Sequence, residues 1–339
     1  MDQHERFWRG RSALAEGDAG ASRPFAIVAA ATGAGASSGA ADAAVAPAPR
    51  PALGPEGGPG LAVPLALDAS RLAEAPPKLW PALARAASAT GCALVLSPDQ
   101  LLARAELFRA ARVATFLSVG PDSQATPGAA RAAGGLLMRL ASRGGAPAVL
   151  DGGALPGWVE ACRALSGYQA PAAVSIPPGR RPPWRAIGEA RAAGLAAVAF
   201  EEGEGAAREP IAARVGRAAQ AASAGGGVAC LLGADEPPDG AELATLLAAG
   251  ARTVVTPGPV EAALRHGGAF EGDWKALADA LAHAVSTVWD DARRVARGAG
   301  CADPRDLGRD NLRALTYDAA ALSGARLSGF DERLPWWVH

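Results

Sequence analysis

The chain has 339 residues and a net charge of −1, and half of its residues are hydrophobic. It is long enough for one large domain or two modest ones, and its charge gives no bias toward nucleic acid. The four cysteines are scattered without a close pair, so the sequence indicates neither a metal cluster nor a disulfide scaffold. The first residues are charged, and no apolar run approaches the length of a membrane span. We expect a cytoplasmic protein that binds neither nucleic acid nor membrane.

Residues 1–60 predict an N-terminal extension and linker. One apolar run, at 25–31, is a candidate strand, and a tract rich in Gly, Ala, Ser and Pro follows it to residue 60. This tract has too few large side chains to build a core. Its GAGASSGA stretch at 33–40 lacks the Lys-Ser/Thr ending of a phosphate-binding loop, so we interpret it as linker.

From residue 61 the pattern becomes regular. Short apolar or β-branched runs alternate with helix-like segments, and the runs show little polar alternation, as in strands that are buried on both faces. Eight such repeats predict an α/β protein with a (β/α)8 TIM barrel over residues 61–265. The predicted strands lie at 61–67, 93–96, 113–119, 147–151, 172–176, 195–200, 227–232 and 252–256.

Residues 266–339 predict a helical extension with a tryptophan-containing tail. Asp273 is placed to cap a long helix, and Gly298 and Gly300 are placed to end it. We expect its apolar stripe to pack on the bottom or side of the barrel, with a partner-binding helix as the alternative. Trp336 and Trp337 in the tail are typical of anchors on another subunit or domain. The predicted stripe is Trp274, Leu277, Leu281, Ala284, Val288, Ala292 and Val295.

Several segments resemble a known family. The ending GAGCADPRDLGRDNLRALTYDAAALSGARLSG at 298–329 resembles the end of the FMN-binding domain of glutamate synthase. The stretches GAELATLLAAGARTVV at 240–255 and QATPG…GGLL at 124–137 are similar to a helix–strand unit and a loop of that domain. The chain is thereby identified as a divergent, stand-alone member. The resemblance implies a flavin barrel that makes glutamate from 2-oxoglutarate and an amide-derived amino group.

The family's two site lysines correspond to Thr126 and Ser175 in this chain. A cation at these places would offset negative charge on a reduced flavin or an oxo acid. Arg180 or Arg181, after the fifth predicted strand, is a candidate replacement, although arginine presents its charge differently from lysine.

The family's phosphate-binding glycines are also replaced. Its Gly-Gly after the seventh strand falls on Asp235 and Glu236, unless a shifted alignment brings in Gly233. Its glycine after the eighth strand falls on Pro257, next to Gly258. Carboxylates repel a phosphate and proline removes an amide donor, so we predict that FMN, implied by the resemblance, has been lost. Gly203 and Gly205 match the family's glycine-rich turn, and residues 259–273 lack its cluster-binding cysteines, so we expect no iron–sulfur cluster.

Three functions remain open. The first is a non-catalytic structural or regulatory subunit of a glutamate-metabolism oxidoreductase, self-associating or paired with an active glutamate synthase-like paralogue. The second is an active FMN-dependent glutamate or N-methylglutamate synthase. The third is a barrel that binds a cationic small molecule or metal through acids at its mouth. Those acids are Asp151, Glu201, Glu202, Glu204, Asp235 and Glu236.

Overall fold

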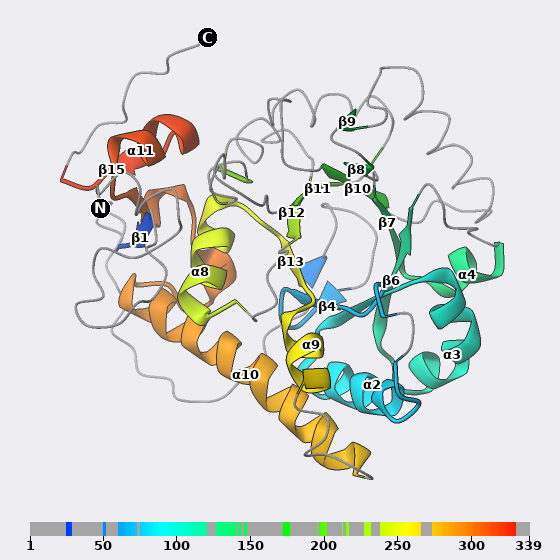
Figure 1. The fold of residues 1–339 in the computed structure, drawn as a ribbon. Coiled ribbons are helices and arrows are strands. Elements are labelled where there is room, and N and C mark those ends of the chain that lie inside the picture. The colour runs from blue at the N-terminus through cyan, green and yellow to red at the C-terminus, as the bar shows by residue number, and fades with distance from the viewer. Residues whose placement is uncertain are drawn as a thin grey trace.

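Eight parallel strands form a closed barrel at the centre of the molecule (Figure 1). This computed structural model describes residues 25–28, 50–51, 60–72, 75–120, 127–139, 142–143, 146–147, 172–176, 195, 197–201, 212, 215–216, 227–231, 238–265 and 273–329. The predicted (β/α)8 barrel is confirmed. In chain order its strands are β4 (Leu65–Asp68), β5 (Ala93–Leu96), β6 (Ala114–Val119), β7 (Gly135–Arg139), β10 (Ala172–Ile176), β11 (Ala197–Glu201), β12 (Gly227–Leu231) and β13 (Thr253–Thr256).

One barrel strand was predicted in the wrong place. The fourth strand is β7, at Gly135–Arg139, whereas the pattern at 147–151 had suggested it. β7 pairs with β6 on one side and with β10 on the other. The barrel closes where β13 pairs with β4, with Val254 opposite Leu65.

The barrel interior is filled mainly by small side chains. Phe116 and Leu137 are its largest members together with Leu61, and the rest of this cluster is alanine and valine. A second cluster lies between the strands and the surrounding helices, and residues next to each other on a strand contribute to opposite clusters, as the pleat requires. The interior cluster is Leu61, Ala66, Ala93, Val95, Phe116, Leu137, Ala173, Ala197, Ala199 and Val255.

The helices around the barrel begin at recognisable caps. Ser97 caps α3 (Pro98–Ala110) in a capping box with Gln100, and Asp239 caps α8 (Gly240–Ala249). Gly91, after α2 (Leu79–Thr90), and Gly250, after α8, adopt the left-handed conformation that ends a helix. Two shorter helices are α4 (Pro127–Ala132) and α9 (Gly258–Arg265).

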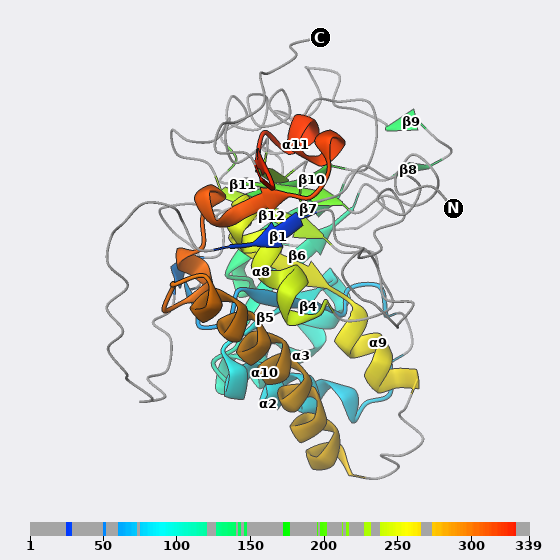
Figure 2. The same ribbon diagram turned by 90° about the vertical axis from the view of Figure 1, so that its left-hand side faces the viewer.

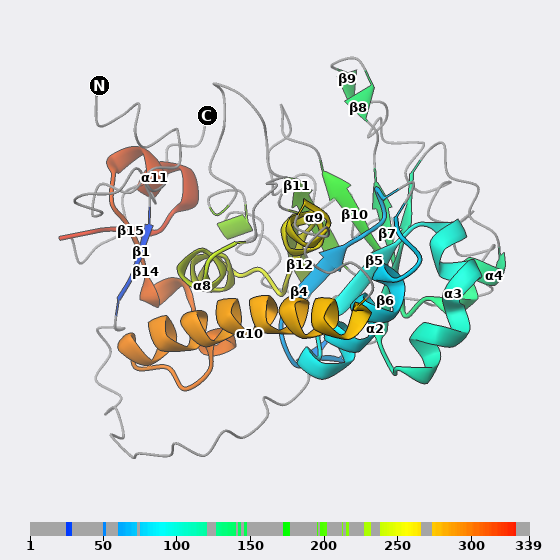
Figure 3. The ribbon, with the colours of Figure 1, turned by 60° about the horizontal axis from the view of Figure 1, so that its bottom comes forward.

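The long C-terminal helix α10 (Trp274–Gly298) packs against α2 and α8 (Figure 3). These two helices follow β4 and β12, the neighbours of β13 in the sheet, so α10 covers the barrel between them. Asp273 caps α10 as predicted, by accepting hydrogen bonds from the amides of Lys275 and Ala276. The buried face shares only Leu277, Leu281 and Ala292 with the predicted stripe. It consists of Leu277, Ala278, Leu281, Val285, Trp289, Ala292 and Ala296.

A small sheet lies beside α8, at one side of the barrel (Figures 1 and 2). Its strand order is β1 (Phe25–Ile27), β14 (Leu312–Ala314) and β15 (Arg326–Leu327). The short helices η2 (Pro304–Asp306), η3 (Arg309–Asn311) and α11 (Tyr317–Ser323) connect these elements. Two further two-stranded ladders pair β2 (Arg50–Pro51) with β3 (Gly60–Leu61) and β8 (Ser142–Arg143) with β9 (Ala146–Pro147).

Candidate functional site

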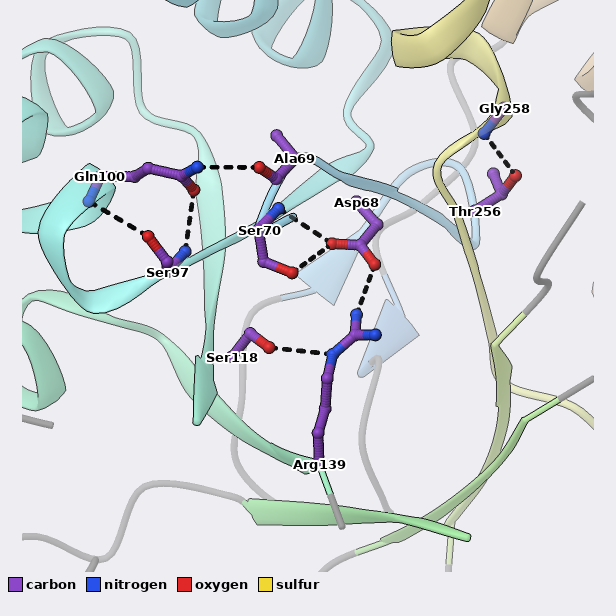
Figure 4. A network of polar contacts seen from close by, with 9 residues as sticks. All are labelled: Asp68, Ala69, Ser70, Ser97, Gln100, Ser118, Arg139, Thr256 and Gly258. Carbon is purple, nitrogen blue, oxygen red and sulfur yellow. Dashed lines mark hydrogen bonds and ion pairs between the residues drawn. The ribbon is translucent and has the colours of Figure 1, made fainter. Parts of the chain in front are cut away.

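Polar side chains gather at the carboxyl ends of the barrel strands, which we call the mouth. Asp68 is the last residue of β4, Arg139 is the last of β7, and Ser118 is one residue from the end of β6. The carboxyl ends of parallel strands lie at one end of a barrel, where TIM-barrel enzymes place their ligands. Figure 4 shows these side chains pointing toward one another.

Asp68 and Arg139 form an ion pair across the mouth, between Oδ2 of the carboxylate and Nη2 of the guanidinium. The side chains are 4% and 14% exposed, so the pair is largely withdrawn from water. Asp68 Oδ1 accepts two further bonds from Ser70, at 3.0 Å from its amide and 2.6 Å from its hydroxyl. Arg139 Nε donates to Ser118 Oγ at 2.9 Å. The guanidinium is thus held by two partners, and its Nη1 makes no hydrogen bond to any described residue.

The loop after β4 is fastened to the start of α3. Gln100 Nε2 donates to the carbonyls of Ala69 and Leu72, at 3.0 and 2.8 Å, and its Oε1 accepts from the amide of Ser97. Gln100 is buried. These bonds fix the backbone on both sides of Ser70, and so they hold the residues that contact Asp68.

The turn that leads from β13 into α9, residues 256–261, offers no amide to a ligand. Pro257 and Pro259 have no N–H, and the amide of Gly258 donates to Thr256 Oγ1 at 3.2 Å. The amides of Val260 and Glu261 donate to the carbonyl of Pro257. Phosphate sites of TIM barrels use the backbone after the last two strands and the N-terminus of a short helix. The described part of this region therefore does not fit the phosphate of FMN.

Ser175 is the one substituted lysine position that the structure describes. It lies on β10 with its backbone directly opposite Arg139 of β7, so it belongs to the mouth. Gly258 also lies at the mouth, with its amide occupied as described above. The backbone of Glu201 ends β11. Outside the described residues lie Thr126, Asp151, Arg180, Arg181, Glu202, Gly203, Glu204, Gly205, Gly233, Asp235 and Glu236.

The sequence analysis missed Asp68, Ser118 and Arg139. Arg139 was overlooked because the fourth strand was predicted at 147–151, so that Arg139 did not stand at the end of a predicted strand. A signal was present, since Asp68 and Arg139 each follow directly on an apolar run, and charged residues at the ends of barrel strands favour a functional position.

Structural comparison identifies enzymes with the same architecture. A mandelate oxidase variant bound to (S)-mandelic acid superposes with a TM-score of 0.59 at 15% identity, covering 92% of this chain and 90% of the other. A Pediococcus acidilactici protein assigned as a lactate oxidase gives 0.57 at 16% identity, over 82% of this chain and 83% of its own. A monotopic membrane protein, (S)-mandelate dehydrogenase, gives 0.56 at 15% identity, over 86% and 88%. The chain shares the fold of these enzymes. No protein-family model matches it, and no curated protein matches it in sequence.

The predicted resemblance to glutamate synthase is therefore wrong, and so is the role in glutamate metabolism that rested on it. The matched segments are local patterns that barrels repeat. GAELATLLAAGARTVV forms a helix, a left-handed glycine and a strand, a unit that any (β/α)8 barrel contains. The C-terminal segment that looked most specific builds part of the small sheet instead.

The two alternative functions that the sequence left open are also wrong. Neither a glutamate or N-methylglutamate synthase nor a barrel for cationic ligands agrees with neighbours named for mandelate and lactate. At the mouth, the carboxylate of Asp68 is already neutralised by Arg139, so this acid is not available to a cation.

Proposed function

We propose that the mouth binds a small α-hydroxy acid, or the corresponding 2-oxo acid, as part of an oxidoreductase of the α-hydroxy acid type. The observation that supports this most is Arg139, a largely buried guanidinium at the ligand-binding end of the barrel, whose Nη1 bonds to none of the described residues. Arginine is well suited to a carboxylate, because its planar donors match the two oxygens. The names of the structural neighbours agree with a hydroxy acid as ligand.

Arg139 would act by positioning and charge. Asp68 and Ser118 hold the guanidinium plane, so that little side-chain freedom remains to be lost when an acid binds. Asp68 also offsets the positive charge in the absence of ligand. The hydroxyls of Ser70 and Ser118 lie next to this pair and complete a polar surface for the hydroxyl or carbonyl of the acid.

FMN is the cofactor that the fold implies, and when bound it would supply a two-electron acceptor. We propose that any flavin bound by this barrel is held without the usual phosphate site. The prolines and internally bonded amides of residues 256–261 support that view. The described residues therefore account for recognition of the acid, and they supply no electron acceptor of their own.

Acid recognition is tested by calorimetric titration with (S)-mandelate and with 1-phenylethanol, which has no carboxylate. We expect mandelate to bind and the alcohol to bind at least tenfold more weakly. Arg139→Met is expected to weaken mandelate binding by about 10- to 150-fold, the range for a bond to a charged group. Arg85→Met, on the exposed outer face of α2, serves as the matched control. Equal binding of acid and alcohol, or unchanged binding by a folded Arg139→Met protein, contradicts the proposal.

The cofactor is tested by titration with FMN and with riboflavin, which has no phosphate. If the phosphate site is lost, the two flavins bind with equal affinity or neither binds. FMN binding that is a hundredfold tighter than riboflavin binding would show a working phosphate site. The flavin titration is independent of the mandelate experiment, because it tests the turn after β13, which lies across the mouth from Arg139 of β7.

Location and self-association remain proposals. No helix among the described residues is long and apolar enough to cross a bilayer. We propose a cytoplasmic location and a homo-oligomer. Cell fractionation and analytical ultracentrifugation test them, and recovery in the membrane fraction or a monomer at micromolar concentration would contradict them.

A further inference from the structure

A cavity lies at the end of the barrel opposite the mouth. Its volume is about 460 Å3, within the range of small-molecule sites. It is bounded by the C-terminal part of α3, the beginnings of β6 and β7, and the end of α4, and α3 and α4 lie side by side (Figure 1). We call it the lower cavity. It contributes nothing to the function proposed above.

The lower cavity combines an apolar wall with a basic rim. Leu101 and Phe108, which are 1% and 2% exposed, lie beneath its surface, and the partly exposed Val113 lines it. Arg109 and Arg112 stand at its edge. Such a surface is suited to a molecule that has an apolar body and an anionic group.

The backbone of Arg112 is held in the left-handed region, with φ at 55°. It follows α3 and completes a Schellman-type ending, in which the amide of Arg112 donates to Arg109 and that of Val113 donates to Phe108. Glycine is the usual residue at this position because a side chain costs free energy there. Arg112 is the only described residue other than glycine with a positive φ. A strained residue in such a place suggests that its side chain has a use.

The charge of Arg112 is uncompensated within the described part of the chain. Arg109 pairs with Glu106 three residues earlier, and both of these side chains are exposed. Arg112 is exposed and takes part in no ion pair with a described residue. The rim therefore carries net positive charge beside an apolar wall.

We propose that the lower cavity binds an amphipathic organic anion, with one or two rings in the cavity and its carboxylate or sulfonate against Arg112. This would be a second site, remote from the mouth. β6 connects the two, because Thr115 lines the lower cavity while Ser118 contacts Arg139. Three residues of extended strand separate these positions by about 10 Å.

The test uses two fluorescent probes that share an apolar body. 8-Anilinonaphthalene-1-sulfonate carries the anionic group, and N-phenyl-1-naphthylamine lacks it. We expect the wild-type protein to bind one sulfonate probe, with at least tenfold higher affinity than the neutral one. Arg112→Gly should remove this advantage, leave the neutral probe unaffected, and unfold at the same or a higher temperature because the backbone strain is relieved. Arg112→Lys should retain part of the preference.

Two further variants locate the binding. Ala105→Phe, which fills the lower cavity from α3, should lower the affinity for both probes at least tenfold. Arg139→Met, at the mouth, should change the affinity for neither probe, whereas it should weaken mandelate binding as stated above. Unchanged sulfonate binding in Arg112→Gly, equal affinity for the two probes, or loss of both only in Arg139→Met would each overturn the proposal.

Discussion

At the scale of single residues, the mouth depends on one buried ion pair. Taking a carboxylate and a guanidinium out of water is costly, and the pair of Asp68 and Arg139 is tolerable because each partner has additional hydrogen bonds. Removing one partner leaves the other charge buried and uncompensated, which costs more than the pair itself contributes.

A double-mutant cycle tests this coupling. Arg139→Met should lower the free energy of unfolding by about 3–5 kcal/mol, because the buried carboxyl group of Asp68 loses its counterion. Adding Asp68→Asn should restore a large part of that loss, since the neutral amide still accepts a hydrogen bond from Ser70. Urea unfolding of the two single variants and the double variant measures the coupling. Additive losses would show that the two side chains act independently.

Cys92 provides a second residue-scale prediction. Burial raises the pKa of its thiol from the ordinary value of 9.0 to about 11, against a smaller opposing contribution from a hydrogen bond with Thr90. The folded protein thus holds this proton more tightly than the unfolded chain, and the free energy of unfolding falls as the pH rises from 9 toward 11. The loss should reach about 2 kcal/mol near pH 10.5. The Cys92→Ala variant should not show this loss. If the free energy of unfolding of the two proteins fell in parallel over this pH range, Cys92 would not be its cause.

Sequence patterns located caps more reliably than site residues. Asp273 was predictable because an acidic residue before an apolar periodic run satisfies the first free amides of a helix. Arg139 was not, because its meaning depends on which strand precedes it and on a partner 71 residues away. The α10 stripe was right at Leu277, Leu281 and Ala292 only. Ala278 and Trp289 show that the contacts with two neighbouring helices, rather than one, select the buried face.

At the scale of elements, α8 and α10 approach each other closely at Gly240. A Cβ added at Gly240, the first residue of α8, would lie 2.2 Å from the Cβ of Asp291 and 2.5 Å from the amide nitrogen of Ala292. These atoms belong to the middle of a long helix, so they cannot move aside without shifting α10. Glycine at this position therefore allows α10 to approach α8 closely.

Gly240→Ala should lower the free energy of unfolding by about 3 kcal/mol, the upper part of the range for overpacking. Gly298→Ala is the matched control, because nothing lies within 4 Å of a Cβ added there. It should be neutral or stabilising by up to about 1 kcal/mol, as alanine favours the helix. Thermal and urea unfolding measure both. An equal effect of the two substitutions would show that the crossing does not resist an added methyl group.

The barrel strands were largely predictable, and the exception has a physical cause. Runs such as Ala93–Leu96 and Ala172–Ile176 are short, apolar and flanked by polar turns, which is typical of a strand buried on both faces. The segments at 135–139 and 147–151 both satisfy this pattern. Hydrogen bonding with β6 and β10, which no local pattern contains, selects the first.

At the scale of the whole molecule, the small sheet joins distant parts of the chain. β1 supplies Phe25, which is buried. The amide of Val28 donates to the backbone carbonyl of Asn311, and the side-chain amide of Asn311 donates to the carbonyl of Val28. β1 and β14 both contact α8. The N-terminal strand is therefore part of the core that surrounds the barrel.

Deleting residues 1–28 should lower the free energy of unfolding by at least about 3–5 kcal/mol, which is the loss expected for a buried phenylalanine. Deleting residues 1–20 leaves β1 in place and is the control. Limited proteolysis should cut first within residues 304–329 in the longer deletion, because β14 would lose its antiparallel partner. Identical unfolding temperatures for the two deletions would show that β1 does not contribute to stability.

The pairing of β1 with β14 has a consequence during synthesis. Phe25 lies opposite Ala314, so β1 pairs with a strand made 289 residues later. At roughly 5–20 residues per second, β1 waits about 15–60 s for its partner. The barrel strands from β4 to β13 are all complete within that interval. A nascent chain stalled between residues 256 and 312 would thus have every barrel strand available while β1 still lacks its partner, and a chaperone that recognises short apolar segments would find Phe25 accessible until β14 is made.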